Sequence, residues 1–410
     1  MVLFLRVTTY LTLLLLGTSA FSQSVSDTLT PPAQLDLLDL AGRWFGFKLV
    51  PGSDTEPHKP QWAVLPSLNF QPATGLAAGA ILTTAFYPKD TPRTRLSTGT
   101  FYVGYSQFNQ IITLAISNIW TKDHRFNLQG DWRFYNFPTT TYGLGAQTQL
   151  ANASLIDYSH IRFHQTVYKA IGRDYMVGLG YLLDRYFDVV NSSPTGQITD
   201  FVRYGLNRQS TSSGVVAGLL RDRRGNPNNP VSGSYLLTQY RFYPTELGSS
   251  SSYQAVLLDY RRYVPLGGRL EKQLAFWSFN WLTFGGYTPY LDLPTTGWDT
   301  FNNSGRGYAL GRLRGPSLYY AEAEYRTQLS ANGLLGGVLF ANAQAIGPWP
   351  NGTPAGLETA VHLCSRKIWP GIGSGLRLKL NKSARTNLAI DYGIGAGGSR
   401  GLYFNLNEAF

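Results

Sequence analysis

Residues 61–410 consist of short runs in which apolar and polar residues alternate, separated by turn-forming residues. In one run Phe126 and Trp132 fall on one face, while Asn127 and Asp131 fall on the other. Because a β-strand places successive side chains on opposite faces, each run has one apolar and one polar wall. The pattern predicts an all-β protein of about 16 antiparallel strands. The expected strands are 61–70, 76–87, 97–107, 110–121, 125–136, 155–170, 174–187, 213–222, 233–243, 253–263, 273–287, 317–328, 334–345, 372–381, 384–394 and 401–410.

The connections between these runs sort by length. Connections after even-numbered runs are short, as at 122–124 and 172–174, whereas several of the others are long, as at 188–212, 288–316 and 346–371. Short turns at one end and long loops at the other are typical of outer-membrane barrels, in which the short turns are periplasmic. We therefore expect a transmembrane antiparallel β-barrel in the outer membrane. Its polar wall faces the lumen, its apolar wall faces lipid, and both termini are periplasmic.

The start of the chain predicts export. A charged Arg6 precedes a short apolar core over 11–16, and small residues follow at Ser19 and Ala20. This arrangement is typical of a secretory signal peptide, and the apolar stretch is too short to span a membrane as a helix. We expect a signal peptide over 1–22, a short periplasmic segment over 23–60 with a helix within 35–47, and the barrel over 61–410.

Charge and composition limit the classes of partner that we expect for the chain. Charged residues make up only 14% of the chain, against ~25% in soluble domains. The net charge is +11, but the basic residues are not clustered, and an exported chain does not meet nucleic acid. They either line a polar lumen or face anionic lipopolysaccharide. We expect outer-membrane lipid and lipopolysaccharide around the barrel, and the general barrel-assembly machinery as the partner for its own insertion.

Candidate chemistry is sparse. His160 and His164 share a face with Arg162 and could bind metal or act as a base, but a polar lumen lining explains them better. The Gly-x-Ser-x-Gly match at 397–401 lies in a glycine-rich hairpin and is followed by a strand, whereas a nucleophile elbow leads from a strand into a helix. We interpret Trp132, Trp277 and Trp281 as lipid-facing or girdle residues rather than a ligand cage. We expect no catalytic residue, no metal and no cofactor.

Pro66 interrupts the first expected strand. Proline cannot donate a hydrogen bond to a strand ladder, so within sheets it occurs at edges or bulges. Two interpretations stay open, because Pro66 could weaken the seam between the first and last strands or occupy a bulge.

Residues 305–326 carry a resemblance to a known family. Their Gly-Arg-Gly-Tyr segment and the following Glu-Ala-Glu-Tyr-Arg strand resemble the Arg-Gly-Tyr/Phe loop and Glu-x-Arg strand of BamA/TamA-type outer-membrane proteins, the bacterial surface-antigen superfamily. Three further segments, 142–145, 220–233 and 390–410, resemble other elements of that family. The resemblance covers essentially all of 61–410.

The resemblance implies a 16-stranded barrel whose loop after the eleventh strand folds back into the lumen. There the loop arginine meets acidic groups on the twelfth and thirteenth strands. Asn342 stands where the family has aspartate, so we expect a neutral hydrogen bond there instead of an ion pair, with Glu324 as the main partner of the arginine. The expected anchor comprises Arg306, Gly307, Tyr308, Glu322, Glu324 and Asn342.

The resemblance also assigns an assembly signal to the C-terminal strand. We expect this strand to end at Phe410, with Phe404 and Leu406 on its lipid face.

The segment over 23–60 is too short for a POTRA domain, the periplasmic module of assembly factors. We therefore expect a POTRA-less, non-enzymatic barrel that acts as a scaffold, a pore or an accessory to outer-membrane protein assembly, with a companion periplasmic subunit as one source of the missing domains. The alternatives are a passive diffusion channel and a barrel-embedded hydrolase. The hydrolase would need a Ser/His/acid constellation that the sequence does not show.

Overall fold

The computed structural model describes residues 35–37, 39–40, 60–71, 75–88, 95–121, 123–136, 139–192, 199–205, 208–267, 269–348, 367–381 and 385–410. These residues form an all-β structure with short helices in its connections. The strands are β1 (Gln61–Gln71), β2 (Gly75–Phe86), β3 (Ser97–Ser106), β4 (Ile111–Trp120), β5 (Phe126–Asn136), β6 (Thr139–Thr141), β7 (Ser154–Ala170), β8 (Met176–Asn191), β9 (Ser210–Asp222), β10 (Gly233–Tyr243), β11 (Tyr253–Leu266), β12 (Arg269–Phe284), β13 (Ser317–Gln328), β14 (Leu335–Ile346), β15 (Trp369–Asn381), β16 (Thr386–Gly395) and β17 (Arg400–Leu406). The helices are η1 (Leu150–Asn152), α3 (Asp200–Gly205), η2 (Thr245–Leu247) and η3 (Tyr290–Asp292).

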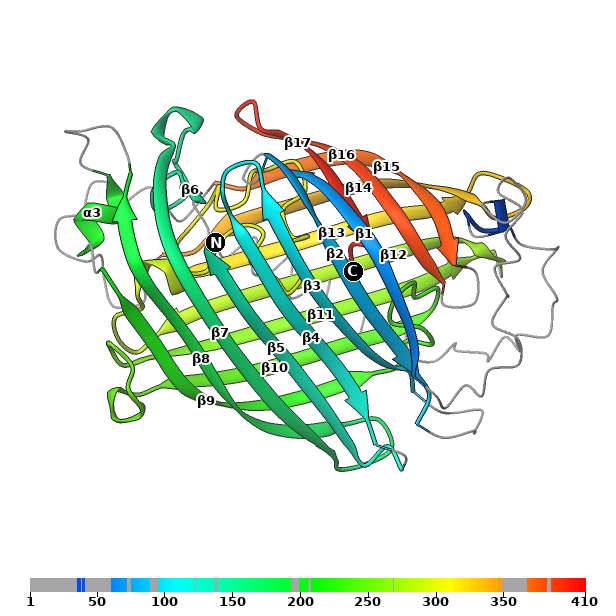
Figure 1. Cartoon of the computed structure of the whole chain (residues 1–410), viewed down its shortest axis with the longest axis horizontal. Helices are drawn as coiled ribbons and strands as arrows, with labels where there is room; N and C mark the ends of the chain where they lie inside the picture. Colours follow the sequence, from blue (N-terminus) through cyan, green and yellow to red (C-terminus); the bar gives the residue numbers. More distant parts are fainter. Residues whose placement is uncertain are drawn as a thin grey trace.

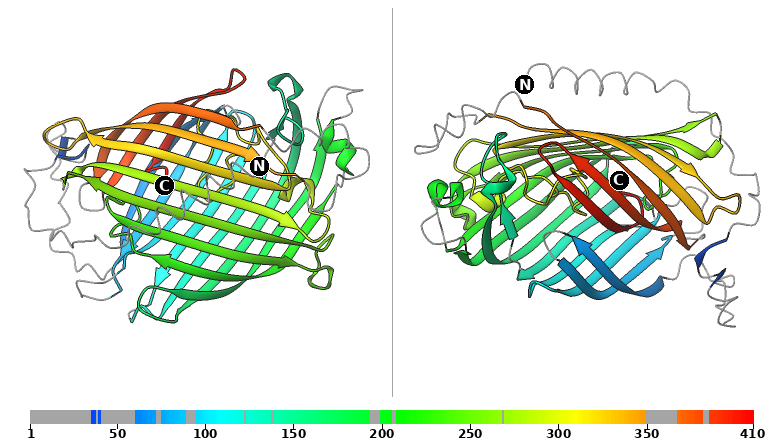
Figure 2. Two further views of the ribbon diagram at one scale, coloured as in Figure 1. Left: turned by 180° about the vertical axis from the view of Figure 1, so that it is seen from behind. Right: turned by 90° about the horizontal axis from the view of Figure 1, so that it is seen from above.

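The strands form one antiparallel sheet of 17 strands, in which sequence neighbours pair. The three-residue β6 is an addition to the edge of β7 within a connection, while β5 pairs directly with β7. Without β6 the sheet has the 16 strands that the alternation predicts, and that prediction is confirmed. Figures 1 and 2 show the tilted strands curling around an interior that holds the yellow connection between β12 and β13.

The first and last strands meet at a seam. They lie side by side, but β1 pairs only with β2 and β17 only with β16 among the described residues. Pro66 pairs opposite Ala80 in a continuous register with β2, so the bulge interpretation is wrong for that ladder. The seam therefore presents two strand edges whose backbone donors and acceptors are not joined to each other.

The outer wall is apolar, as expected of a barrel that faces lipid. Val64, Leu179, Leu339 and Ile372 are each more than 60% exposed. The interior side of the same strands carries buried charged residues, including Asp184. No helix among the described residues is long and apolar enough to cross a membrane.

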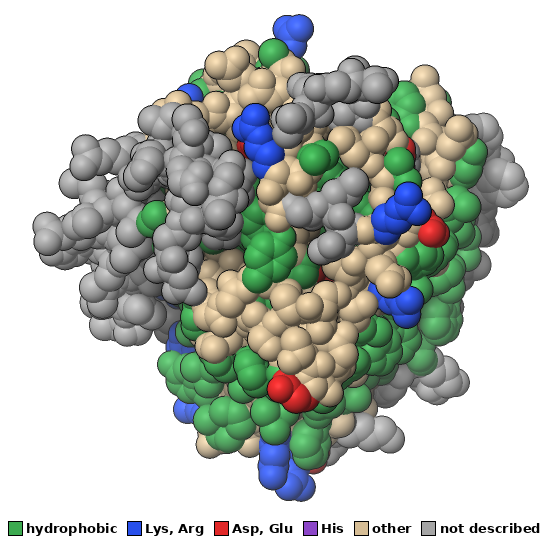
Figure 3. Space-filling view, turned by 90° about the vertical axis from the view of Figure 1, so that its left-hand side faces the viewer, with side chains coloured by type: hydrophobic (Ala, Val, Ile, Leu, Met, Phe, Trp, Pro, Cys, Tyr) green, Lys and Arg blue, Asp and Glu red, His purple; other side chains and the backbone are tan. Residues whose placement is uncertain are grey.

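The long connections fold over one end of the barrel. Phe201 and Tyr204 of α3 pack against Tyr290 and Leu291 of η3, together with Leu144 from the connection after β5. Figure 3 views this end: few charged side chains lie on its described surface, and hydrophobic ones gather towards the rim. Residues 193–198 and 349–366 of the long connections lie outside the described residues.

The opposite end carries the short turns and the described part of the N-terminal segment. Leu37, Asp39 and Leu40 are helical, within the helix expected over 35–47, and the backbone N–H of Leu35 donates to the carbonyl of Asn332. Asn332 lies in the turn between β13 and β14. The expected signal peptide over 1–22, and the rest of 23–60 up to residue 59, lie outside the described residues.

Two expectations about side-chain placement are wrong. Trp132 is 45% exposed on the outer wall, but Trp277 is 2% exposed inside the barrel and Trp281 lines an internal pocket. The last strand ends at Leu406 rather than at Phe410, because Asn407 has a positive φ of 70° and the chain leaves the sheet there. The tail that follows turns inward, and Figure 1 places the C-terminus within the outline of the barrel.

Candidate functional site: the loop anchored in the lumen

The connection between β12 and β13, residues 285–316, enters the lumen and lies against the inner wall. Gly307 has a φ of 99°, a conformation that favours glycine. Its backbone also approaches β16 closely, since a Cβ added at Gly393 would lie 2.6 Å from the Gly307 nitrogen. Glycine at both positions therefore lets the loop backbone lie directly on the sheet.

This close approach places Arg306 at the centre of three carboxylates. Its guanidinium donates to Asp391 at 2.6 Å, to Glu322 at 2.5 Å and to Glu324. The Arg306 side chain has no exposed surface, and its guanidinium carbon lies 3.8 Å from the ring centroid of Phe340. Burial alone would lower the pKa of Arg306, but the three carboxylates raise that pKa well above its ordinary value. The arginine is therefore permanently charged, and both terminal nitrogens of its guanidinium are paired with carboxylates.

Two further arginines extend the cluster towards the C-terminal tail. Arg326 donates to Glu324 at 2.6 Å, and Arg377 donates to Asp391 at 2.5 Å and to Glu408 at 2.8 Å. Opposite charges thus alternate along a continuous network. We call these residues the Arg306 cluster; its arginines are Arg306, Arg326 and Arg377, and its acids are Glu322, Glu324, Asp391 and Glu408.

Neutral groups fix the loop backbone beside the cluster. The amide nitrogen of Asn342 donates to the Arg306 carbonyl at 2.9 Å and to Glu322 at 3.3 Å. Asn342 thus makes neutral contacts with the loop backbone instead of pairing with the guanidinium. The Tyr403 hydroxyl accepts from the Gly307 N–H at 2.9 Å and donates to the Tyr308 carbonyl at 2.8 Å.

The structure therefore brings together the six residues that the resemblance singles out for the anchor. Sequence reasoning missed Asp391, Arg377 and Glu408. Strand alternation could have identified Asp391, because its neighbours Ile390 and Tyr392 face outward and Asp391 therefore faces the lumen. Glu408 gave no such signal, since it lies beyond the turn at Asn407, where strand parity no longer holds.

The C-terminal tail completes this end of the lumen. Phe410 is 3% exposed and stacks on Trp277, with ring centroids 5.2 Å apart. The guanidinium of Arg326 donates to the Phe410 carbonyl oxygen at 3.1 Å. The expectation that Phe410 ends a lipid-facing strand is therefore wrong, whereas Phe404 remains on β17, paired with Ile390.

A second cluster lies deeper towards the long-loop end. Asp184 of β8 accepts from Arg162 at 2.7 Å and contacts His160 at 2.9 Å and His164 at 2.6 Å. We call these four residues the Asp184 cluster. The expected lumen-lining role of the histidines matches this placement. Among the described residues the side-chain hydrogen bonds of both histidines go to Asp184 rather than to a serine, and no three His, Cys, Asp or Glu side chains group to hold a metal ion.

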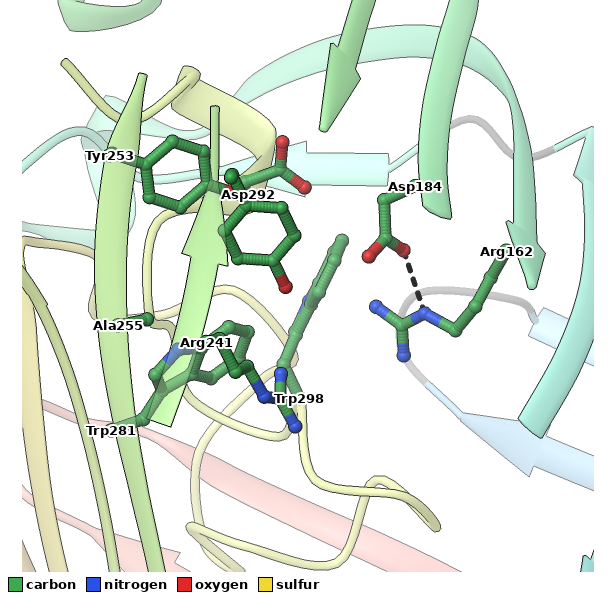
Figure 4. A pocket seen from close by; sticks show the side chains of 9 residues that line it. Arg162, Asp184, Arg241, Tyr253, Ala255, Trp281, Asp292 and Trp298 are labelled. Carbon is green, nitrogen blue, oxygen red and sulfur yellow. Dashed lines mark hydrogen bonds and ion pairs between the residues drawn. The ribbon is translucent and has the colours of Figure 1, made fainter. Parts of the chain in front are cut away.

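Asp292 of the loop faces the Asp184 cluster across a small pocket. Arg162, Asp184 and Asp292 line it together with Arg241, Tyr243, Tyr253, Ala255, Trp281 and Trp298 (Figure 4). The Ser212 hydroxyl donates to Asp292 at 2.6 Å. Burial, and then the negative charge of Asp184, raise the pKa of Asp292 to about 8.

Between the two clusters the loop crosses the lumen. Arg133 of β5 donates to the Thr300 carbonyl at 2.7 Å, and Asn303 donates to the Ala409 carbonyl at 2.8 Å. The loop therefore bridges opposite walls and the tail, and it occupies the interior that an open pore would need.

These features define a class: an antiparallel barrel with an apolar outer wall and a loop tied into its lumen. The Omp85 superfamily domain matches residues 97–410, and the chain belongs to that superfamily. It is accordingly a non-enzymatic barrel of the outer membrane, as the resemblance implied.

Solved structures show the same fold. The chain is similar to BamA from Haemophilus ducreyi lacking POTRA domains 1–3, with 14% identity and a TM-score of 0.54, over 85% of this chain and 70% of that one. It is also similar to CdiB from Acinetobacter baumannii, with 13% identity and a TM-score of 0.50, over 84% of this chain and 59% of CdiB. No curated protein sequence matches the chain.

Proposed function

We propose that this barrel is an accessory to outer-membrane protein assembly, and that it offers the seam between β1 and β17 to client strands. The observation that carries the proposal is the seam, where two neighbouring strands form no ladder among the described residues. An unpaired strand edge is a template on which another strand can add. The likeness to BamA supports the proposal at the level of the fold.

The lumen argues against the alternative of a passive diffusion channel. The loop over 285–316 is tied to β5, β13, β16 and the tail, so solute would have to displace a hydrogen-bonded segment. We expect little steady current through the purified barrel in a planar bilayer. A stable open conductance would favour the channel and contradict the assembly role.

Site-specific photo-crosslinking tests the seam directly. Val64 on β1 is 71% exposed, and Leu179 on β8, away from the seam, is 72% exposed, so the two positions form a matched pair. A photo-reactive residue at position 64 should crosslink to newly exported outer-membrane proteins in cells, whereas the same residue at position 179 should contact only lipid. Equal crosslinking at both positions, or none at position 64, would refute the proposal.

We also propose that the short turns face the periplasm. A companion subunit in the periplasm is part of the same proposal. Affinity isolation from native membranes should then recover a periplasmic protein together with the barrel. Tags in whole cells should label residue 200 from outside and leave residue 173 unlabelled.

A further inference from the structure

The outer wall near the short turns carries two arginines without an acidic partner. Leu220 and Tyr263 belong to the interior cluster and are each 1% exposed. Because side chains alternate along a strand, their neighbours Arg221 on β9 and Arg262 on β11 face outward. Both lie close to the ends of their strands that lead into the short turns.

The sheet register places these two side chains on one face, on either side of β10. Arg221 pairs with Leu236 of β10, and Leu236 pairs with Tyr260 of β11, two residues before Arg262. Neighbouring strands are ~4.8 Å apart, so two long side chains can both extend over β10, which lies between β9 and β11. Tyr260 is only 4% exposed although it faces outward, and it interacts electrostatically with both arginines.

The contrast with the inward arginines of the same region is informative. Arg224 is ion-paired with Asp222, and Arg261 is ion-paired with Asp259, both at 2.7 Å. Within the described part of the chain, Arg221 and Arg262 form no ion pair, and the Nε atom of each is buried without a hydrogen-bond partner. The Arg221 guanidinium lies over the Tyr175 ring, 5.5 Å from its centroid, a contact that leaves its charge without an anion. A cation on a lipid-facing wall is costly unless an anion meets it. Inside the barrel, aspartates of the protein supply that anion. On the outer wall the described residues supply none, so the anion has to come from the surroundings.

We propose that Arg221 and Arg262 bind the headgroup phosphate of an anionic phospholipid in the leaflet next to the short turns. Guanidinium groups pair with phosphate through two parallel hydrogen bonds, which a single tyrosine hydroxyl cannot replace. Outward leucines continue the same face towards the membrane centre, which gives an acyl chain an apolar surface. These are Leu219, Leu236 and Leu258.

Native mass spectrometry of the folded, full-length chain in neutral detergent tests this site. Phosphatidylglycerol should bind more tightly than phosphatidylcholine with the same acyl chains. Arg221→Gln and Arg262→Gln should each weaken phosphatidylglycerol binding about 5-fold, and the double variant about 25-fold, if each arginine contributes ~1 kcal/mol at the membrane surface. Arg185→Gln is the control, since Arg185 is an exposed outward arginine on β8, away from this pair, and its loss should leave binding within about 2-fold.

Three results would overturn the proposal. They are unchanged binding by the double glutamine variant, equal binding of the two phospholipids, and tighter binding of lipid A, which belongs to the other leaflet. Inorganic phosphate distinguishes a lipid site from a free-anion site: if it displaces phosphatidylglycerol at equal concentration, the lipid claim fails. The double lysine variant keeps both charges and should retain most of the binding, and a heat-modifiable band verifies that each variant is folded.

Discussion

Two charged clusters hold the same loop, and they are built in opposite senses. In the Arg306 cluster, a cation of the loop inserts among three carboxylates, two from β13 and one from β16. In the Asp184 cluster, a carboxylate of the wall is surrounded by Arg162 and two histidines, and the loop brings a second carboxylate, Asp292, towards it. The first arrangement joins opposite charges, whereas the second brings like charges together.

The difference separates a permanent anchor from a conditional one. Every carboxylate around Arg306 has a guanidinium partner, and the arginine itself stays charged because its pKa is raised well above its ordinary value. Asp292 has only the Ser212 hydroxyl as a hydrogen-bond partner in the described residues, and it faces the negative Asp184. Its raised pKa means that it keeps a proton at neutral pH. The loop is therefore bound through ion pairs at one end, whereas at the other end it presents a protonated acid to Asp184.

The largest effect is expected from breaking the permanent anchor. Arg306→Ala leaves buried carboxylates without their shared cation, which costs on the order of 3–5 kcal/mol. Urea unfolding of the refolded barrel should show this loss, and surface display should fall. Glu324→Gln should be milder, because Asp391 and Glu322 still pair with the arginine.

A double variant of Arg306 and Glu324 sharpens the result. Since the two residues share one ion pair, the combined loss should be smaller than the sum of the single losses. Fully additive losses would show that the loop is not anchored through this pair.

An intermediate effect is expected from the tail that closes the Arg306 end. Phe410→Ala removes a buried ring from Trp277, and large-to-small changes of this kind cost about 3 kcal/mol. The amount of folded barrel in the outer membrane should fall while synthesis continues, which heat-modifiable bands on gels can measure. Phe404→Ala is the outward comparison and should cost less, since lipid covers that face. If only the Phe404 change reduced the folded amount, the inward tail would have no part in assembly.

The sequence predicted the sheet well, because alternation is local and repeats in every strand. It also placed Arg306 near Glu322 and Glu324 through the resemblance and strand parity. The sequence-based prediction failed for residues that lie beyond the end of a strand and for apolar residues whose side chains face the lumen. Glu408 and Phe410 follow a turn at Asn407. This turn places their side chains inside the barrel, although strand alternation predicts the lipid face, and no local sequence pattern predicts the turn. Trp277 has the composition of a lipid-facing residue, yet the tail packs against it inside the barrel, a contact 133 residues away in sequence (410 minus 277).

The most selective effect, which depends on pH, concerns the conditional anchor. The folded-state pKa of Asp292 is about 8, above its ordinary value of 3.8, so its contribution to stability is fully present below pH 3.8 and is lost as pH rises through about 8. Between these limits each pH unit costs at most about 1.4 kcal/mol. Asp292→Asn keeps a neutral side chain of the same size at every pH. Urea unfolding at pH 5, 7 and 9 should therefore show wild type losing stability relative to this variant as pH rises. Other groups titrate in both proteins and cancel in the difference. Parallel stability curves for the two proteins would mean that the pKa of Asp292 is not raised in the folded barrel.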